Sequence, residues 1–465
     1  MTARRTVPAA VVVMVAVLAL LGLATGQPAS AGQRVGARSS VGGLDDSIHL
    51  NQIQVVGSHN SYHVEGSQAE KDLRRSFIGD GENLLEYGHV PLGQQFAEQK
   101  VRQVELDVYR DDAGGKYANP LIRQVTGGGP YDPEMNQPGT KVLHVQDVDY
   151  RSSCLKFTDC LAAVKTWSDA NPSHVPIAIL IELEDQPVPF TAAGITFVVP
   201  DPWTAPGALD GLDNEIRSVF SPSDLITPDQ IRGTHATLEE AVLQDGWPTL
   251  GASRGKVMFL MDNGGGYRNA YLTGHPNLNG RILFTNSSPG QPDAAFVEVN
   301  DSRNNVAYIQ SLVQKGYVVR SRADSDTVEA RNNDITARDA AFQSGAQWVS
   351  TDYPTPSYAR DKFSNDYLVR LPGNIVARCN PVNAPPGCVD TAVETGFDET
   401  AVPEPPPPPP SPTPPPPAPT PLPGAVISPL PAPAVNPLPT YVAPAAPTYS
   451  SEPATAVYSA PTYTG

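Results

Sequence analysis

The stretch Val101–Arg110 (VRQVELDVYR) is expected to form a short apolar strand that ends in two carboxylates. Residues i and i+2 of a strand share a face, so Glu105 and Asp107 point to the same side. Two like charges this close repel each other, so the pair is stable only beside a cation, a shared proton or a basic partner. The alternative is a surface strand with a solvated acidic face, and polar residues at the ends of other strands argue against it.

Short apolar, β-branched runs recur along the chain from residue 50 to 352, separated by stretches with a helical period. This alternation predicts an α/β fold with a parallel sheet buried on both faces. Eight such units favour a (β/α)8 TIM-type barrel over an open doubly wound sheet, which more often has a Gly-rich first loop. The expected strands are Ile53–Gly57, Arg102–Val108, Lys141–Val145, Ile177–Leu183, Lys256–Met261, Ala294–Val299, Tyr317–Arg322 and Gln347–Ser350. The expected helices cover residues 92–100, 159–170, 213–220, 238–243, 305–315 and 327–344.

The first 31 residues have the three parts of a secretory signal peptide. Two arginines precede an apolar run at 11–23, and Ala-Ser-Ala at 29–31 matches a cleavage site. The apolar run is short for a membrane span, so cleavage and export are favoured over retention as an anchor. We therefore expect a secreted, extracellular protein, with residues 32–48 as a polar leader.

The chain changes composition after the expected barrel domain at 49–392. Residues 393–465 contain an unbroken proline run at 405–410 and three copies of Pro-Thr-Tyr. This proline-rich tail cannot bury a core and is expected to be extended or disordered. A solvated spacer is the plain interpretation, and contact with a cell wall, a partner or attached sugars is the alternative.

Charge and cysteine content limit the partners. The formal net charge of −17 argues against nucleic acid, because neutralising phosphates requires clustered Lys and Arg. The charge also argues against binding anionic membranes by electrostatics alone, although local apolar contacts to lipid remain open. The four cysteines form two local pairs, which in an exported chain favour disulfide loops 154–160 and 379–388 among three possible connectivities.

Four expected strands end in polar residues that a structural role does not need. In a barrel the carboxyl ends of all strands meet at one rim, so residues far apart in sequence would share one pocket. The residues at these ends are Ser58–His63 (SHNSYH), Glu105, Asp107, His144, Glu182 and Glu184.

This set is suited to a hard cation and to proton transfer. Its amide and carboxylate oxygens favour Ca²⁺, with Mg²⁺ as the alternative. The cation would lower the pKa of an attacking hydroxyl and offset the charge on phosphoryl oxygens. The histidines would remain free, one to stabilise an oxyanion and one to protonate a leaving oxygen. Together they predict phosphodiester cleavage. The cation ligands would be Asn60, Glu105, Asp107 and Glu182, and the free histidines His59 and His144.

These residues resemble a known family. The chain is similar to the catalytic domains of calcium-dependent, phosphoinositide-specific phospholipases C, above all the secreted bacterial single-domain type. The resemblance covers roughly residues 50–354, extends more weakly to 388, and excludes the tail. It rests on His59-Asn60-Ser61-Tyr62 as HN-x-Y, Glu105-Leu106-Asp107 as E-x-D, His144, Ile181-Glu182, and the closing segments 321–327 and 345–353.

The resemblance implies roles for individual residues. Asn60, Glu105, Asp107 and Glu182 would bind Ca²⁺, and His59 and His144 would be the catalytic pair. Glu105 would also accept the proton of the inositol 2-hydroxyl, which attacks phosphorus as diacylglycerol leaves. The product would be a cyclic inositol phosphate that water can open, and the substrate a phosphoinositide or another phosphodiester lipid at a membrane surface.

Other polar residues are assigned by position. Arg322 and Asp324 end the seventh expected strand and are candidates for substrate binding, against an internal salt bridge as the alternative. Tyr353 closes the eighth expected strand and is a candidate for lining the sugar pocket. Five further histidines (63, 89, 174, 235 and 275) show no partner pattern and are expected to be surface or locally bonded residues.

Two other functions remain open. A glycerophosphodiesterase or a sphingomyelinase-D-like phosphodiesterase would also use two histidines and an E-x-D pair, but glycerophosphodiesterases typically follow the first histidine with arginine, where this chain has Asn60. The other possibility is a catalytically silent barrel that acts as a secreted binding module through its tail.

Overall fold

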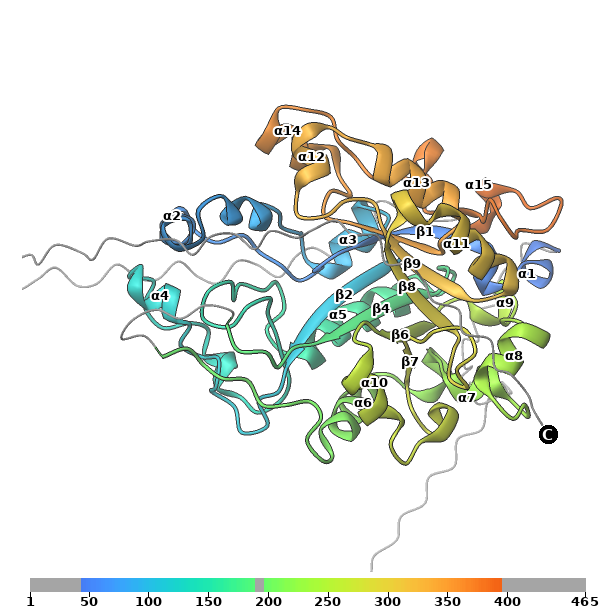
Figure 1. The fold of residues 1–465 in the computed structure, drawn as a ribbon, viewed down its shortest axis with the longest axis horizontal. Coiled ribbons are helices and arrows are strands. Elements are labelled where there is room, and N and C mark those ends of the chain that lie inside the picture. Colours follow the sequence, from blue (N-terminus) through green and yellow to red (C-terminus); the bar gives the residue numbers. More distant parts are fainter. Residues whose placement is uncertain (1–42, 189–195, 395–465) are drawn as a thin grey trace, which may run out of the picture. The chain divides into compact units, whose positions relative to one another are not determined.

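The structure, a computed structural model, describes residues 43–188 and 196–394 (Figure 1). The expected signal peptide, most of the expected leader and the tail beyond residue 394 lie outside these residues. Among the described residues, no helix combines the length and the apolar character needed to cross a membrane.

Parallel strands form one curled sheet, as the sequence predicts for a TIM-type barrel. From β1 the sheet runs through β2, β4 and β6 to β7 in one direction, and through β10 and β9 to β8 in the other. An isolated parallel bridge between Asn286 and Phe296 joins the region after β7 to β8. The strands are β1 Ile53–Ser58, β2 Gln103–Tyr109, β4 Ile177–Leu183, β6 Val257–Met261, β7 Leu283–Thr285, β8 Phe296–Asp301, β9 Val318–Arg322 and β10 Trp348–Thr351.

Burial explains why these strands read as near-continuous apolar runs. Every residue of β1, β2, β6 and β10 is buried, because the sheet is covered on both faces. β1 approaches β2 so closely that a Cβ on Gly57 would lie 1.8 Å from Oε1 of Gln103. Only glycine therefore fits at this point of the sheet. Figure 1 shows β2, β4 and β6 side by side, with helices above and below the sheet.

Helices follow most strands, close to the expected positions. The expected helix 327–344 is instead two helices, α12 Val328–Asn332 and α13 Thr336–Ser344, because Asn333 between them adopts a left-handed conformation (φ 52°). Asparagine tolerates this conformation better than most residues. The other helices are α1 Leu44–Ser47, α2 Gln68–Ile78, α3 Leu92–Glu98, α4 Leu121–Val125, α5 Phe157–Ala170, α6 Ala208–Val219, α7 Pro228–Arg232, α8 Leu238–Gln244, α9 Leu250–Ser253, α10 Gly265–Leu272, α11 Ser302–Lys315, α14 Pro356–Phe363 and α15 Asp390–Val393.

The third expected strand is not part of the barrel. β3 (Lys141–Val142) pairs antiparallel with the end of β2, with Val142 opposite Val108. The chain after β2 makes a long excursion and folds back on the strand it has just left, so β4 occupies the barrel position beside β2. His144 therefore lies in a loop after β3. The structure adds three short strands that the sequence analysis missed: β5 Leu225–Ile226, β7, and β11 Ala377–Cys379.

The described ends of the chain pack at the amino ends of the barrel strands. Asp45 of α1, inside the expected leader, pairs with Arg254 at 2.7 Å just before β6. Glu394, the last described residue, pairs with Arg102 at the start of β2. Both expected disulfides are present, Cys154–Cys160 and Cys379–Cys388.

Candidate active site

A cluster of three carboxylates lies between β2 and β4. The register of the two strands places Asp107 directly opposite Glu182, and Glu105 lies one i+2 step away. One oxygen from each of the three side chains lies within 4.8 Å of the others. Burial raises the pKa of Asp107 well above its usual range, and the charges of Glu182 and Glu105 raise it further. Burial and Glu105 likewise raise the pKa of Glu182 to about 8.

Asn60 lies in the turn that follows β1, and this turn is bonded to β2 at Glu105. The backbone N–H of Ser61 donates to the carbonyl of Glu105 at 3.0 Å, and the N–H of Glu105 donates to Oγ of Ser61 at 2.8 Å. These bonds fix the turn against β2. Asn60 itself has a φ of 42°, a left-handed conformation that asparagine accepts more readily than most residues.

Two oxygens at the cluster are buried and have no hydrogen-bond partner. The amide of Asn60 donates to the Tyr87 hydroxyl at 2.8 Å, which leaves its Oδ1 unpartnered. The Tyr62 hydroxyl donates to Oδ2 of Asp107 at 2.5 Å, which leaves Oδ1 of that carboxylate unpartnered. Unsatisfied buried oxygens are costly, and an all-oxygen, anionic set is what Ca²⁺ prefers. The residues present therefore fit a calcium ion.

A buried arginine neutralises part of the cluster. Arg320 on β9 forms ion pairs with Glu105 and, at 2.5 Å, with Glu298 on β8. No motif marks this arginine in the sequence. The sequence does indicate that Arg320 shares a face with Arg322, because residues two apart on a strand point to the same side.

His59 lies on the rim beside the carboxylates. Its Nδ1 is 2.8 Å from Oδ1 of Asp352, and its Nε2 is 3.7 Å from Oε1 of Glu105. Arg322 contacts the same ring, with Nη1 3.1 Å from Nε2. Burial and the arginine lower the pKa of His59 below its usual value, against the two carboxylates, which raise it. The ring is thus held in place and favoured in its neutral form.

His144 has the opposite environment. Its Nδ1 is 2.8 Å from Oδ2 of Asp149. Burial lowers its pKa, but the hydrogen bond and charge of Asp149, together with Glu182 and Glu184, raise it above the usual value. His63, which has no motif of its own in the sequence, is fully buried and contacts the same aspartate at 2.9 Å. The two predicted catalytic histidines therefore differ: the surroundings of His59 lower its pKa, and those of His144 raise its pKa.

The three predicted substrate-binding residues lie at different depths. Arg322 is at the rim, in contact with His59 and Asp352. Asp324 is 1% exposed and accepts hydrogen bonds from the backbone of Asp352 and from Tyr367. Burial and the charge of Asp352 raise the pKa of Asp324 to about 7. Tyr353 is fully buried. Substrate contact at Asp324 and Tyr353 stays a prediction.

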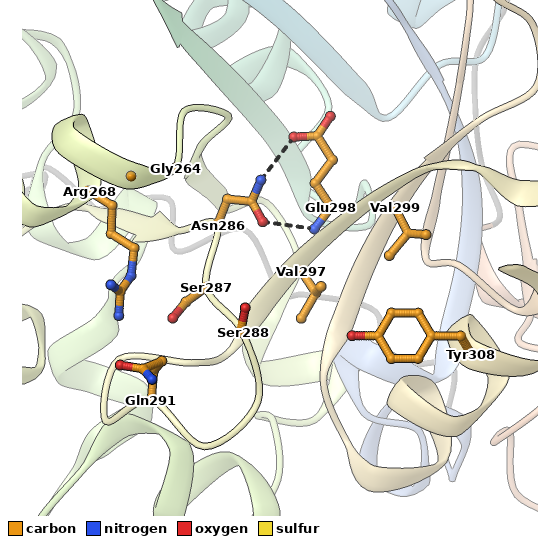
Figure 2. A pocket seen from close by; sticks show the side chains of 11 residues that line it. Gly264, Arg268, Asn286, Ser287, Ser288, Gln291, Val297, Glu298, Val299 and Tyr308 are labelled. Carbon is orange, nitrogen blue, oxygen red and sulfur yellow. Dashed lines mark hydrogen bonds between the residues drawn. The ribbon is translucent and has the colours of Figure 1, made fainter. Parts of the chain in front are cut away.

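A pocket of 530 Å³ lies next to this site, between α10 and α11 (Figure 2). The connection from β7 to β8 contains no helix, so the outer face of β8 is partly uncovered here. Figure 2 shows Asn286 hydrogen-bonded to Glu298 through both its amide nitrogen and its oxygen. Glu298 in turn pairs with Arg320, so the pocket wall and the carboxylate cluster share one chain of contacts.

Comparisons with known proteins give one family. The model of the family described as phosphoinositide phospholipase C, Ca²⁺-dependent, matches residues 48–381, a range that contains every site residue above. No curated protein matches the chain.

The solved structures that the chain matches include three bacterial proteins. A calcium-dependent phosphoinositol-specific phospholipase C from a Pseudomonas species is 14% identical, with a TM-score of 0.44 over 72% of this chain and 96% of that one. A Ca²⁺-dependent phosphatidylinositol-specific phospholipase C from Streptomyces antibioticus is 18% identical, with a TM-score of 0.42 over 67% and 97%. A glycerophosphoryl diester phosphodiesterase from Parabacteroides distasonis is 13% identical, with a TM-score of 0.27 over 72% and 93%.

Proposed function

The chain belongs to the family of Ca²⁺-dependent phosphoinositide phospholipases C, and from this premise we propose that it is a secreted enzyme that cleaves phosphatidylinositol-type lipids. The products would be diacylglycerol and a cyclic inositol phosphate, formed by attack of the inositol 2-hydroxyl on phosphorus. The observation that carries the proposal is the oxygen cluster of Glu105, Asp107 and Glu182, with His59 3.7 Å from Glu105 and with His144 near enough for the charge of Glu182 to raise its pKa.

The surroundings of each side chain indicate which proton transfer it would carry out. Glu105, 3.7 Å from His59, would accept the proton of the 2-hydroxyl. His144, whose pKa is raised, would donate a proton to the departing diacylglycerol oxygen. Arg322 would stabilise negative charge on the phosphoryl oxygens, and His59 would do so once it has taken up a proton on Nε2. A bound Ca²⁺, held by the carboxylate cluster and Asn60, would lower the pKa of the attacking hydroxyl and offset phosphate charge.

Exposed apolar side chains near the site support action at a membrane surface. Phe77, Ile78 and Leu84 are 58%, 38% and 41% exposed, and Val328 at the start of α12 is 50% exposed. The hydroxyl of Thr327 donates to the carbonyl of Asn83 at 2.8 Å, so the segments that carry them touch. The two segments follow β1 and β9 on the carboxyl side of the barrel, where the site lies. We call these four residues the apolar rim.

Secretion and the role of the tail are part of the proposal. The signal-like first 31 residues and the two disulfides are typical of an exported protein. The proline-rich tail would then act outside the cell, as a spacer or in contact with the cell wall.

Cleavage of phosphatidylinositol vesicles tests the function. Phosphorus NMR would follow the products with Ca²⁺ and with a chelator, for the wild type and for His59→Ala. We expect a cyclic inositol phosphate that forms only with Ca²⁺, and a loss of kcat of about 100-fold or more in the variant, with calcium binding retained. Release of choline or glycerol phosphate would indicate a related phosphodiesterase instead. No turnover of any phosphodiester would indicate a binding module.

A further inference from the structure

Asp149 lies between two histidines and contacts both through one oxygen. Its Oδ2 is 2.8 Å from Nδ1 of His144 and 2.9 Å from Nε2 of His63. The rings of the two histidines meet edge to face, with centroids 5.8 Å apart. His144 is the most exposed of the three, with 26% of its side chain accessible, whereas Asp149 and His63 are buried. The arrangement is therefore a buried pair that supports one accessible ring.

His63 is fixed from both sides. Its Nδ1 is 3.0 Å from the carbonyl oxygen of Tyr87, which can only accept a hydrogen bond, so the ring donates there. Its Nε2 faces Oδ2 of the Asp149 carboxylate at 2.9 Å. The Tyr87 ring packs on it with centroids 4.5 Å apart, and its backbone bridges to Ser152. This ring has no freedom to act on a substrate, but it can fix the carboxylate.

Asp149 is held as an ionised acceptor. Burial would raise its pKa, but His63 and His144 together lower it well below the usual range. Nη1 of Arg74 lies 3.6 Å from its other oxygen, and the same guanidinium donates to the carbonyl of Val148 at 3.0 Å. An ionised carboxylate facing Nδ1 keeps a proton on that atom. The other ring nitrogen of His144, Nε2, is thereby the one available for chemistry.

We propose that Asp149 is a positioning residue for His144, and that His63 positions Asp149 in turn. The proposal rests on the function proposed above and extends it by two residues. The chain of contacts Tyr87 carbonyl, His63, Asp149, His144 fixes both the ring orientation and the tautomer of the proton donor. The hydrogen bonds favour this reading over a metal site on the same three side chains, because both histidine nitrogens already face the same carboxylate oxygen.

The first test is kinetic and uses Asp149→Asn. We expect kcat on phosphatidylinositol vesicles to fall about 100-fold with KM within about threefold, because the proton donor loses its orientation but the substrate contacts remain. Asp169→Asn on α5, an exposed aspartate that pairs with Lys165, is the matched control and should leave kcat unchanged. If Asp149 acts through His144, the double variant with His144→Ala should be no slower than His144→Ala alone.

The second variant separates positioning from packing. His63→Gln keeps an amide donor toward Asp149, whereas His63→Leu keeps volume without a donor. We expect His63→Gln to retain more of kcat than His63→Leu at similar thermal stability. Equal losses in the two would show that His63 contributes packing alone and would overturn its part of the proposal.

A readout without turnover distinguishes failure of this proposal from failure of the proposed function. Nitrogen-15 NMR of the histidine rings, recorded above the pKa of His144 where the ring is neutral, should show its remaining proton on Nδ1 in the wild type and a mixture of tautomers in Asp149→Asn. The pKa of His144 should fall in that variant, since Asp149 raises it; Glu182 and Glu184 also face the ring and remain in place. These results in a protein inactive on phosphatidylinositol would reject the substrate and keep the positioning. A folded Asp149→Asn with wild-type kcat, or with multiplicative losses in the double variant, would overturn the positioning.

Discussion

Asp107 and Glu182 make the stability of the folded protein depend on pH when no cation neutralises them. Both have raised pKa values in the fold, so the folded protein binds more protons there than the unfolded chain does. Their contribution to stability is therefore largest at low pH and is lost as the pH rises. For Glu182 this window runs from its ordinary value of 4.5 to about 8.

The first prediction is a stability that falls as the pH rises when Ca²⁺ is absent and that Ca²⁺ restores. With a chelator present, the free energy of unfolding should decrease between pH 4.5 and pH 8, and Ca²⁺ at 100 times its Kd should restore about 2.7 kcal/mol. Thermal unfolding across this pH range, with chelator or Ca²⁺, measures both effects. Glu182→Gln should flatten the pH dependence and weaken the calcium effect. A thermal unfolding midpoint that is the same with chelator and with Ca²⁺ would contradict the proposed ligands.

The second prediction concerns Arg320. Its removal would leave Glu105 and Glu298 buried without their cation, and breaking such a buried pair typically costs about 3–5 kcal/mol. We expect Arg320→Met to lower the free energy of unfolding by that amount in chemical denaturation. Arg322→Met is the control. Arg322 lies two residues further along the same strand face, nearer the carboxyl end of the barrel, and its replacement should reduce activity with a smaller loss of stability. Equal losses of stability in the two variants would contradict the role given to Arg320.

At the scale of single residues, motif spacing was enough to predict which side chains at the strand ends lie together. His59, Asn60 and the E-x-D pair converge in the structure because barrel geometry brings strand ends together. The supporting residues could not be found this way. Asp149 and Arg320 act through partners 5 and 215 positions away, and no periodicity in the sequence links such pairs.

At the scale of elements, the differences come from short or folded-back strands. β7 has three residues, too few for any alternation to be read. The run at 141–145 has the composition of a barrel strand, but only pairing distinguishes a parallel neighbour from an antiparallel return, and β3 pairs with the end of β2. The longer strands and helices were predictable because their apolar periodicity reflects burial directly.

The third prediction concerns the Cys154–Cys160 loop, which supports the His63 turn. The backbone N–H of Ser153 donates to the carbonyl of Tyr62 at 2.8 Å, so the disulfide loop and the turn after β1 are joined. Replacing both cysteines by serine should cost about 2 kcal/mol, as expected for so small a loop. It should also lower kcat, because the turn that carries His63 loses its support. The matched control removes the Cys379–Cys388 pair, whose Cys379 is the last residue of β11, and should lower stability with little effect on kcat. A kcat unchanged by loss of the first disulfide would contradict the link.

At the scale of the whole barrel, its two ends have different tasks. The amino ends of the strands are closed by ion pairs from the described ends of the chain, Asp45 with Arg254 and Glu394 with Arg102. The carboxyl ends carry the carboxylates, the histidines and the apolar rim. This division is typical of the barrel fold. Interactions at the amino ends of the strands stabilise the fold, and the loops at the carboxyl ends are free to carry the chemistry.

The fourth prediction tests whether the carboxyl face meets lipid through the apolar rim. Fully burying one large apolar side chain is worth about 1.5–3 kcal/mol, so Phe77→Ser and Leu84→Ser should each weaken vesicle binding about tenfold or more. Sedimentation with phosphatidylinositol vesicles measures binding, and a short-chain substrate below its micelle concentration measures the chemistry. We expect turnover of the monomeric substrate to stay at the wild-type rate, because neither residue contacts the carboxylate cluster. Ile335→Ser, at a residue outside the apolar rim that is about as exposed as Leu84, should leave vesicle binding unchanged. Equal loss in all three variants would mean that apolar exposure in general, and not this rim, drives the protein to the membrane.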